Sequence, residues 1–388
     1  MKRRLLVKNA RLLRGGVWES GSMLAEDGVI VAVGKTPEPA DAAVLDAEGA
    51  LLVPGFLDLH THGAVGVDVN AADAEGLLRI SRFFAAHGVT GWLCSILTDT
   101  EEQTLRAIGA ARELMDAEKQ RRTGGARLLG IHLEGPFLAE AYAGAMPKHL
   151  LRTGDIELVR RYQRAAAGAI RSITVAPEVA GVTEIIPALA AEGILVSLGH
   201  SNATFAEAMA AVDAGARSIT HTFNAMRLFH QHEPALMGAA LASDVYCEAI
   251  LDGLHLHPGT VRMLLRTKGA DRVVPVTDSI MAAGLPDGDY RLGVNDIIVA
   301  NGDAMLREKP VRAGSTLTLD RALQNIMAFT GASVGTAAGM LSKNAAALLG
   351  QNDLGRIGPG AEASFVLLDE RGAVLKTYIR AEQAQTER

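Results

Sequence analysis

The hydrophobic positions follow a regular alternation through most of the chain. From Leu51 onward, apolar runs of strand length alternate with longer stretches in which apolar residues recur every three or four positions. The first pattern is typical of buried parallel strands and the second of amphipathic helices, expected for example at residues 74–86, 101–118 and 205–214. Eight apolar runs occur, ending near Leu59, Cys94, Leu133, Ala176, Leu198, Thr220, Ile250 and Val276. Eight strand–helix repeats predict a closed (β/α)8 barrel.

Both ends of the chain show a different pattern, in which short strands are separated by turns. Such strands are expected at residues 5–7, 28–34 and 43–46, and again within 355–369. After the eighth barrel strand, the pattern predicts three further strands near 290–292, 296–300 and 304–306, then helices at 319–329 and 333–348. The predicted fold is therefore α/β: a (β/α)8 TIM barrel with a small β-sandwich domain formed by the N- and C-terminal segments. We expect the barrel to span residues 54–354 and the sandwich to combine 1–53 with 355–388.

Composition and charge narrow the class of protein. Hydrophobic residues make up 48% and charged residues 21% of the 388 positions, which excludes a disordered or fibrous chain. The formal net charge is −6 without a basic stripe, so we expect no nucleic-acid partner. The two cysteines, Cys94 and Cys247, fit a reduced compartment better than a disulfide framework. No run approaches about 18 uninterrupted apolar residues, so we expect a soluble cytoplasmic protein with no membrane partner.

Polar residues that suit metal binding follow five of the predicted strands. They are His60 and His62, Glu134, His200, His221 and Asp278. In an extended segment residues two apart point to the same side, so His60 and His62 can face one ion. The carboxyl ends of barrel strands meet at one face, where catalytic groups gather. The histidine pair alone would leave the question open, whereas the full set indicates a metal site. His87 and His149 are expected to be ordinary surface or helix-end groups.

Several of these segments resemble a known enzyme family. Residues 54–63, PGFLDLHTHG, are similar to the opening of the amidohydrolase superfamily. Five further segments resemble the N-acetylglucosamine-6-phosphate deacetylase family: HLEGPF at 132–137, LGHSNAT at 198–204, HTFNAM at 221–226, LDGLH at 251–255 and VTD at 276–278. Each motif is common by itself, but the combination is specific. The resemblance extends from about residue 5 to about residue 370.

The resemblance implies a divalent metal held by Glu134, His200 and His221, with Glu134 where many relatives use a carboxylated lysine. Because this sequence retains His60 and His62, which some family members have lost, one or two ions per subunit are expected. Imidazole and carboxylate ligands suit zinc, and also iron, manganese or cobalt.

The chemistry follows from these residue types. A bound metal lowers the pKa of water towards about 7 and so supplies hydroxide for amide hydrolysis. Asp278 is expected to take the water proton and pass it to the leaving nitrogen. The alternative for Asp278 is a hydrogen-bonded carboxylate in the barrel mouth that takes no part in proton transfer.

The first departure from the family pattern concerns the acetyl carbonyl. Many members carry Gly-Ala-His after the EGPF motif, where this chain has Gly144, Ala145 and Met146. Methionine cannot donate a hydrogen bond, so we expect the second metal to polarise the carbonyl instead. Ala145 remains a predicted substrate contact.

The second departure concerns the phosphate. His232 stands where relatives commonly have an arginine that meets the sugar phosphate, often across a subunit boundary. Histidine lacks the bidentate fork of arginine and is only partly charged at neutral pH. Arg227, His230 and the backbone amides of Asn224 and Ala225 are the remaining candidates, although Arg227 is equally consistent with a solvated loop residue. His255 is expected to contact the sugar hydroxyls, with an ordinary loop histidine as the alternative.

The resemblance implies a metal-dependent deacetylase that converts N-acetyl-D-glucosamine 6-phosphate to D-glucosamine 6-phosphate and acetate. The expected partner is thus a small amino-sugar molecule, and the expected assembly is a homodimer. Alternatives are a deacetylase of N-acetylgalactosamine 6-phosphate or of a non-phosphorylated N-acetylhexosamine, or an N-acyl-amino-acid deacylase. A non-catalytic scaffold is the alternative from another class, against which the complete set of metal-binding residue types argues.

Overall fold

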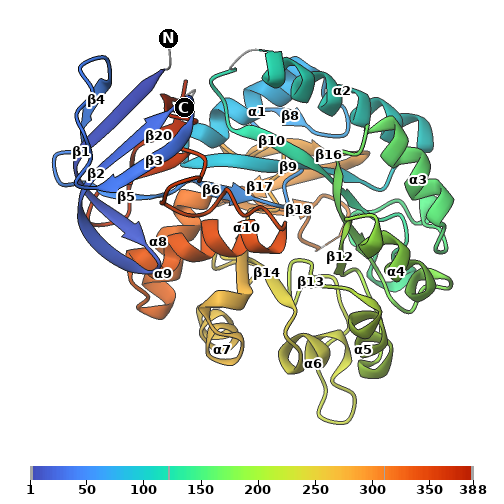
Figure 1. Cartoon of the computed structure of the whole chain (residues 1–388). Coiled ribbons are helices and arrows are strands. Elements are labelled where there is room, and N and C mark those ends of the chain that lie inside the picture. Colours follow the sequence, from blue (N-terminus) through green and yellow to red (C-terminus); the bar gives the residue numbers. More distant parts are fainter. Residues whose placement is uncertain (1–2, 121–122, 310, 386–388) are drawn as a thin grey trace.

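The computed structural model describes residues 3–120, 123–309 and 311–385, and its centre is a sheet of eight parallel strands (Figure 1). In chain order the strands are β6 (Phe56–Asp58), β9 (Val89–Leu97), β10 (Arg127–Glu134), β11 (Ile170–Val175), β12 (Leu195–Leu198), β13 (Ser218–Ile219), β14 (Tyr246–Ile250) and β15 (Val273–Val276). Neighbours along the chain are neighbours in the sheet throughout. The first and last strands meet just beyond their ends, where Thr61 and Ser279 form a parallel bridge. The predicted (β/α)8 barrel is thereby confirmed.

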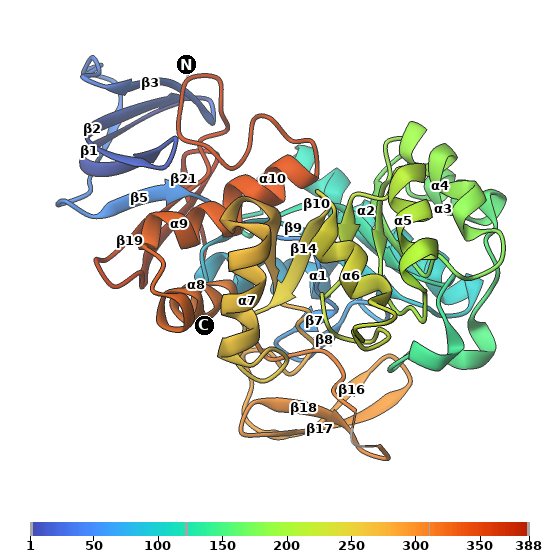
Figure 2. The same ribbon diagram turned by 90° about the horizontal axis from the view of Figure 1, so that it is seen from below.

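Helices connect most of the strands and cover the barrel from outside (Figures 1 and 2). They are α1 (Ala74–Ala86), α2 (Glu101–Gln120), α3 (Ile156–Ala165), α4 (Val182–Ala191), α5 (Phe205–Ala214), α6 (Ala235–Ala242) and α7 (Pro258–Lys268). Local signals fix their starts: the Asp73 side chain accepts the Gly76 N–H at the start of α1, and Thr204 with Glu207 forms a capping box at α5. The predicted limits of α1 and α5 are confirmed at both ends.

The two ends of the chain combine in a second sheet (Figure 1, blue and red). Its strands are β1 (Arg4–Arg14), β2 (Val17–Glu26), β3 (Val29–Gly34), β4 (Ala43–Asp46), β5 (Leu51–Pro54), β19 (Phe365–Leu368), β20 (Val374–Ile379) and β21 (Glu382–Gln383). The order is β21-β20-β19-β5-β1-β2-β3, with β4 beside β1. Leu52 on β5 is paired with Leu367 on β19, so the N- and C-terminal segments join through these two strands. This terminal sheet has its own core, in which the rings of Phe365 and Tyr378 stack.

Gly55 separates the terminal sheet from the barrel, because β5 ends at Pro54 and β6 begins at Phe56. A Cβ at Gly55 would lie 2.0 Å from the Thr90 hydroxyl, so only glycine fits this close approach of β9. The limits of the barrel at residues 54 and 354 remain predictions. The assignment of residues 1–53 and 355–388 to one domain remains a prediction.

Smaller elements complete the fold, and the first of them follows β15. The strands β16 (Gly288–Leu292), β17 (Asn295–Ala300) and β18 (Asp303–Leu306) form an antiparallel sheet, here called the flap (Figure 2). Its buried residues pack with Leu97 and Met146, which places the flap at the carboxyl ends of the barrel strands. A short hairpin of β7 (Gly63–Ala64) and β8 (Val67–Asp68) follows β6. One-turn 3-10 helices occupy Glu140–Tyr142, Lys148–Leu150 and Ala270–Arg272.

The C-terminal helices differ from the prediction in two respects. The helix α8 (Leu319–Thr330) extends one residue beyond its predicted end. The single helix expected over 333–348 is instead α9 (Val334–Gly339), a π turn at Met340–Asn344 and α10 (Ala345–Leu348). Within this turn the Asn344 amide donates hydrogen bonds to the carbonyls of Ala270 and Val273. Such a tertiary contact has no counterpart in the helical pattern, so the prediction missed the change of pitch.

Two further features bear on the sequence-based expectations. In the described part of the chain, no helix combines the length and the apolar character needed to cross a bilayer. Cys94 and Cys247 are both buried as free thiols. Burial raises the pKa of the Cys94 thiol to about 12, so this side chain acts as a small apolar core residue.

Candidate metal centre

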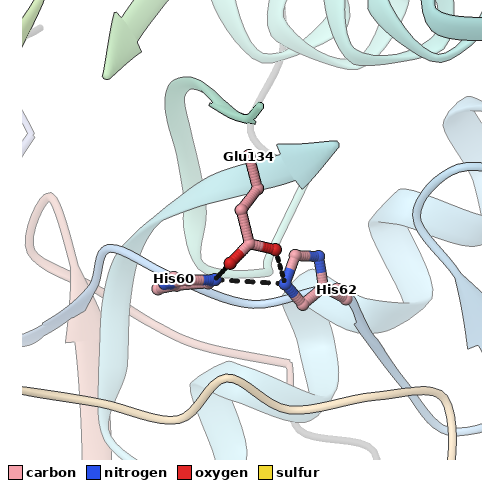
Figure 3. Close-up of side chains that lie close together, drawn as sticks. All are labelled: His60, His62 and Glu134. Atoms are coloured by element: carbon pink, nitrogen blue, oxygen red, sulfur yellow. Dashed lines mark hydrogen bonds and ion pairs between the residues drawn. The ribbon is translucent and has the colours of Figure 1, made fainter. Parts of the chain in front are cut away.

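The site begins with a histidine pair that directly follows the first barrel strand. His60 Nε2 and His62 Nε2 lie 3.1 Å apart, and both face the carboxylate of Glu134 at the end of β10 (Figure 3). His60 Nε2 is 3.4 Å from Glu134 Oε1, and His62 Nε2 is 3.2 Å from Glu134 Oε2. All three residues are buried. The alternation of the extended segment therefore places both imidazoles on one side, as predicted.

A second histidine pair approaches the same carboxylate from β12 and β13. His200 Nε2 and His221 Nε2 lie 3.1 Å and 3.2 Å from Glu134 Oε1, and they are 3.1 Å from each other. Two groups of three residues, each with ligand atoms within 4.8 Å of one another, thus share Glu134. An arrangement of two histidine pairs around one carboxylate is that of two adjoining cation sites with a common bridge.

The backbone is turned into an uncommon conformation at three residues of the site. The φ angles of His200, His221 and Asp278 are 47°, 27° and 48°, in the left-handed region. For residues other than glycine this conformation costs on the order of 1 kcal/mol or more, and it persists only where the surrounding structure holds it. At each position the strand has just ended and the side chain turns towards the barrel axis. The left-handed conformation therefore orients these three side chains at some cost in the stability of the fold.

The second ring nitrogen of most of these histidines has a fixed partner. His62 Nδ1 lies 3.0 Å from the Ser95 carbonyl and His200 Nδ1 lies 2.7 Å from the Tyr142 carbonyl. Because a carbonyl only accepts, Nδ1 carries a proton, which leaves Nε2 as the ring atom that could bind a cation. His60 Nδ1 lies 3.3 Å from the carboxylate of Glu248. Four Nε2 atoms and one carboxylate facing a common point fit a divalent metal with imidazole and carboxylate ligands.

Asp278 adds a second carboxylate to the same point. Its Oδ1 lies 3.3 Å from His62 Nε2 and 3.7 Å from His60 Nε2. Burial raises the pKa of Asp278, but the attraction of His60 and the hydrogen bond with His62 lower it to about 2. The two effects have opposite signs at His62: burial lowers its pKa, but hydrogen bonds with Asp278 and Glu134 raise it to about 9. The site therefore keeps Asp278 ionised.

The site lies at the base of a cavity of about 480 Å³. The cavity is lined by four of the predicted substrate-binding residues, Ala145, Asn224, Ala225 and His255. His255 is held in place by Asp252, whose Oδ2 lies 2.6 Å from Nδ1, so Nε2 is left for a ligand. Met146 is buried beside Ala145 and packs against the flap. The structure thus brings these four residues to the same cavity as the metal-binding groups.

Two predicted phosphate contacts lie elsewhere. Among the described residues that line the cavity, neither Arg227 nor His232 is present. His232 is exposed, and its backbone N–H donates a hydrogen bond to His230 Nδ1. The neighbouring Leu228 is 80% exposed, so this loop projects from the barrel. Within one chain, His232 therefore cannot serve a ligand in the cavity.

Sequence reasoning missed several residues that shape the site. The segment that follows the flap supplies Lys309, Val311, Arg312, Ala313 and Gly314 to the cavity wall, and the loop after β10 supplies Lys148. None of these belongs to a metal-binding motif. Glu248 was also missed, although a carboxylate in the otherwise apolar β14 could have indicated it. His87, by contrast, forms the expected ordinary contact, with Nδ1 3.0 Å from Asp320.

The chain is similar over almost its whole length to proteins of known function. Residues 51–384 match the Amidohydrolase family. The N-acetylglucosamine-6-phosphate deacetylase of Bacillus subtilis (strain 168) is 35% identical, covering 98% of this chain and 97% of that protein. The N-acetylgalactosamine-6-phosphate deacetylase of Escherichia coli O157:H7 is 33% identical, covering 98% and 99%. A mutant N-acetyl-D-glucosamine-6-phosphate deacetylase from Mycobacterium smegmatis, solved in complex with N-acetyl-D-glucosamine-6-phosphate, superposes with a TM-score of 0.89 at 33% identity, covering 98% and 99%.

Proposed function

The chain belongs to the amidohydrolase family, and we propose that it is a metal-dependent deacetylase that hydrolyses N-acetyl-D-glucosamine 6-phosphate to D-glucosamine 6-phosphate and acetate. The observation that carries this proposal is the shared position of Glu134 between two histidine pairs, with Asp278 beside them. Full-length relatives with this activity, one of them solved with the substrate, support the choice of substrate.

The metal would be held by two sets of ligands. Glu134, His200 and His221 would hold one ion, and His60 and His62 with Glu134 would hold a second. When bound, a divalent ion lowers the pKa of the attacking water towards about 7 and polarises the acetyl carbonyl. Zinc suits these ligands best, and iron, manganese and cobalt are also compatible with them.

The chain's own residues then move the proton and orient the sugar. Asp278 takes the proton of the attacking water at Oδ1 and delivers it to the amide nitrogen, which leaves as an amine. His255 donates or accepts at the sugar hydroxyls from the cavity wall. Ala225 lies on the same wall, whereas the Asn224 N–H already donates to the His221 carbonyl. Met146 offers no hydrogen bond to the acetyl oxygen. Polarisation of the acetyl carbonyl would therefore depend on the ion held by His60, His62 and Glu134.

In this proposal, binding of the sugar phosphate depends on the assembly of two subunits. We infer that the backbone amide of Ala225 binds the phosphate, because the Asn224 N–H already donates to the His221 carbonyl. Arg227 and His232 would reach the phosphate only from a partner subunit. The exposure of Leu228, 80%, and of Phe229, 56%, supports a homodimer formed through this loop. The two reduced, buried cysteines support a cytoplasmic location.

The 4-epimer is the second candidate substrate. The Escherichia coli relative that carries the name N-acetylgalactosamine-6-phosphate deacetylase is 33% identical, close to the 35% of the Bacillus subtilis relative. An acetate-release assay with N-acetylglucosamine 6-phosphate, N-acetylgalactosamine 6-phosphate, free N-acetylglucosamine and an N-acetyl amino acid separates the candidates. We expect the highest kcat/KM with the first compound. A higher value with any other would replace the proposed substrate, and no release with any of them would favour a non-catalytic scaffold.

A further inference from the structure

Glu248 is a buried carboxylate that the proposed reaction does not use. It lies in the middle of β14, where the other residues are apolar or aromatic except for the Cys247 thiol, and only 4% of its side chain is exposed. A buried carboxylate is costly unless a hydrogen bond or a positive centre compensates it. Among the described residues, the ionisable side chain that faces it is His60, with Nδ1 3.3 Å from Glu248 Oε2.

The His60 ring links Glu248 to the metal-binding groups. Its Nδ1 faces Glu248, while Nε2 faces Glu134 and His62 on the other side of the ring. A carboxylate accepts a hydrogen bond from the Nδ1–H group and so favours the tautomer in which Nε2 carries the lone pair. It also makes the imidazole a stronger donor towards a cation than a neutral partner would.

The other histidines of the centre have weaker support of this kind. His62 and His200 bond to backbone carbonyls, and the buried Nδ1 of His221 has no hydrogen-bond partner in the described part of the chain. A carboxylate therefore supports one histidine in the group of His60, His62 and Glu134. No histidine in the group of Glu134, His200 and His221 has a carboxylate at its Nδ1 in the described part of the chain.

We propose that Glu248 is a positioning residue that makes the His60–His62–Glu134 group able to hold a second metal ion. This inference rests on the proposed metal-dependent function and deepens it. Glu248 acts through the His60 ring and does not touch the substrate cavity, whose described lining omits it. Glu248 thereby determines whether the chain binds two metal ions or one.

Metal titration of the full-length chain tests this role. The metal-depleted protein is titrated with Co²⁺ and followed by visible absorption, and zinc content is measured after equilibrium dialysis. Glu248→Met keeps the length of the side chain and removes the acceptor. We expect the parent to hold two ions, and this variant to bind one with parental affinity and the other roughly 10- to 100-fold more weakly. Glu248→Gln, which retains an acceptor oxygen without the charge, should show a smaller loss in the same direction.

Two controls separate positioning from a general effect on the fold. In a His60→Ala/His62→Ala background, adding Glu248→Met should leave the affinity for the remaining ion unchanged. Glu118→Met makes the same change at the opposite end of the barrel, since Glu118 contacts Leu128, about 20 Å along β10 from Glu134. That variant should bind both ions like the parent.

The inference is overturned if Glu248→Met binds both ions with parental affinity, if the parent binds only one, or if the variant weakens the remaining ion in the double-alanine background. Should Glu248→Met fail to fold, parental binding by Glu248→Gln overturns it equally. A parent that binds two ions but releases no acetate from any N-acetyl substrate contradicts the proposed function and leaves the role of Glu248 standing.

Discussion

Replacing Glu118 by glutamine should change the pH dependence of stability without touching the metal centre. Glu118 lies near the end of α2, partly buried, and its carboxylate accepts the Leu128 N–H at the start of β10. Burial raises the pKa of this carboxyl to about 7 from an ordinary value of 4.5, against the lowering effect of the Leu128 hydrogen bond and of Arg127. The folded chain therefore keeps a proton here at pH values where the unfolded chain has lost it.

The sign and the size of the effect follow from linkage. A folded-state pKa above the unfolded value gives stability that is fully present below about pH 4.5 and is lost as the pH rises through about 7. A pKa of about 7 instead of 4.5 corresponds to about 3 kcal/mol, at roughly 1.4 kcal/mol for each tenfold change in proton affinity. Because the side chain is only partly buried, remaining solvent reduces this to on the order of 1–3 kcal/mol. Glutamine cannot ionise, so the variant should gain this amount relative to the parent between the two pH values.

Urea unfolding of parent and variant at pH values from 4.5 to 8 measures the difference directly. The matched control is Glu113→Gln, on the exposed side of the same helix, whose difference from the parent should not vary with pH. A Glu118→Gln difference that is equally flat across this range, or that falls as the pH rises, would refute the reasoning.

The remaining predictions concern the reaction. Asp278→Asn should keep its metal content and lose roughly 100-fold or more in acetate release, whereas loss of the metal would make Asp278 a ligand instead of a proton carrier. The His60→Ala/His62→Ala variant should retain one ion with sharply lower turnover, and full turnover would contradict the need for two. His232→Arg should raise the preference for the 6-phosphate over free N-acetylglucosamine by about tenfold to 150-fold, the range for a charged hydrogen bond of roughly 1.5–3 kcal/mol. An unchanged preference would mean that the phosphate is bound away from this loop.

The barrel and its metal-binding groups could be predicted because their signals are local. Each ligand follows an apolar run, and parallel strands in a barrel end at the same face, so position along the chain was enough to bring the histidines and Glu134 together. The end of β9 was placed at Cys94 and lies at Leu97, because the polar Ser95 interrupts the apolar run while the buried strand continues beyond it. A buried strand can thus be recognised from the sequence, but the residue at which it ends cannot be placed as well.

The cavity wall could not be predicted for the opposite reason. Arg312 lies in the segment after β18, outside any helix or strand, so no local periodicity shows that it lines the cavity. The path of the loop at His232 depends on tertiary packing, and the expectation of a phosphate contact there came from its place in a motif alone. Glu248 depends on a contact with a residue 188 positions away, which no pattern within one strand can reveal.

The seam of the barrel has a consequence for the order in which the protein assembles. Thr61 and Ser279, 218 residues apart, share a hydrogen bond, and the Asp278 N–H donates to the His60 carbonyl. During synthesis the first histidines emerge long before the strand that closes the ring, so the nascent chain holds them without their final neighbours. An ion held by His60, His62 and Glu134 beside the seam would bind the closed ring more tightly than the open one and so favour the last step of closure. Metal supply during expression should consequently affect the yield of folded protein as well as its activity.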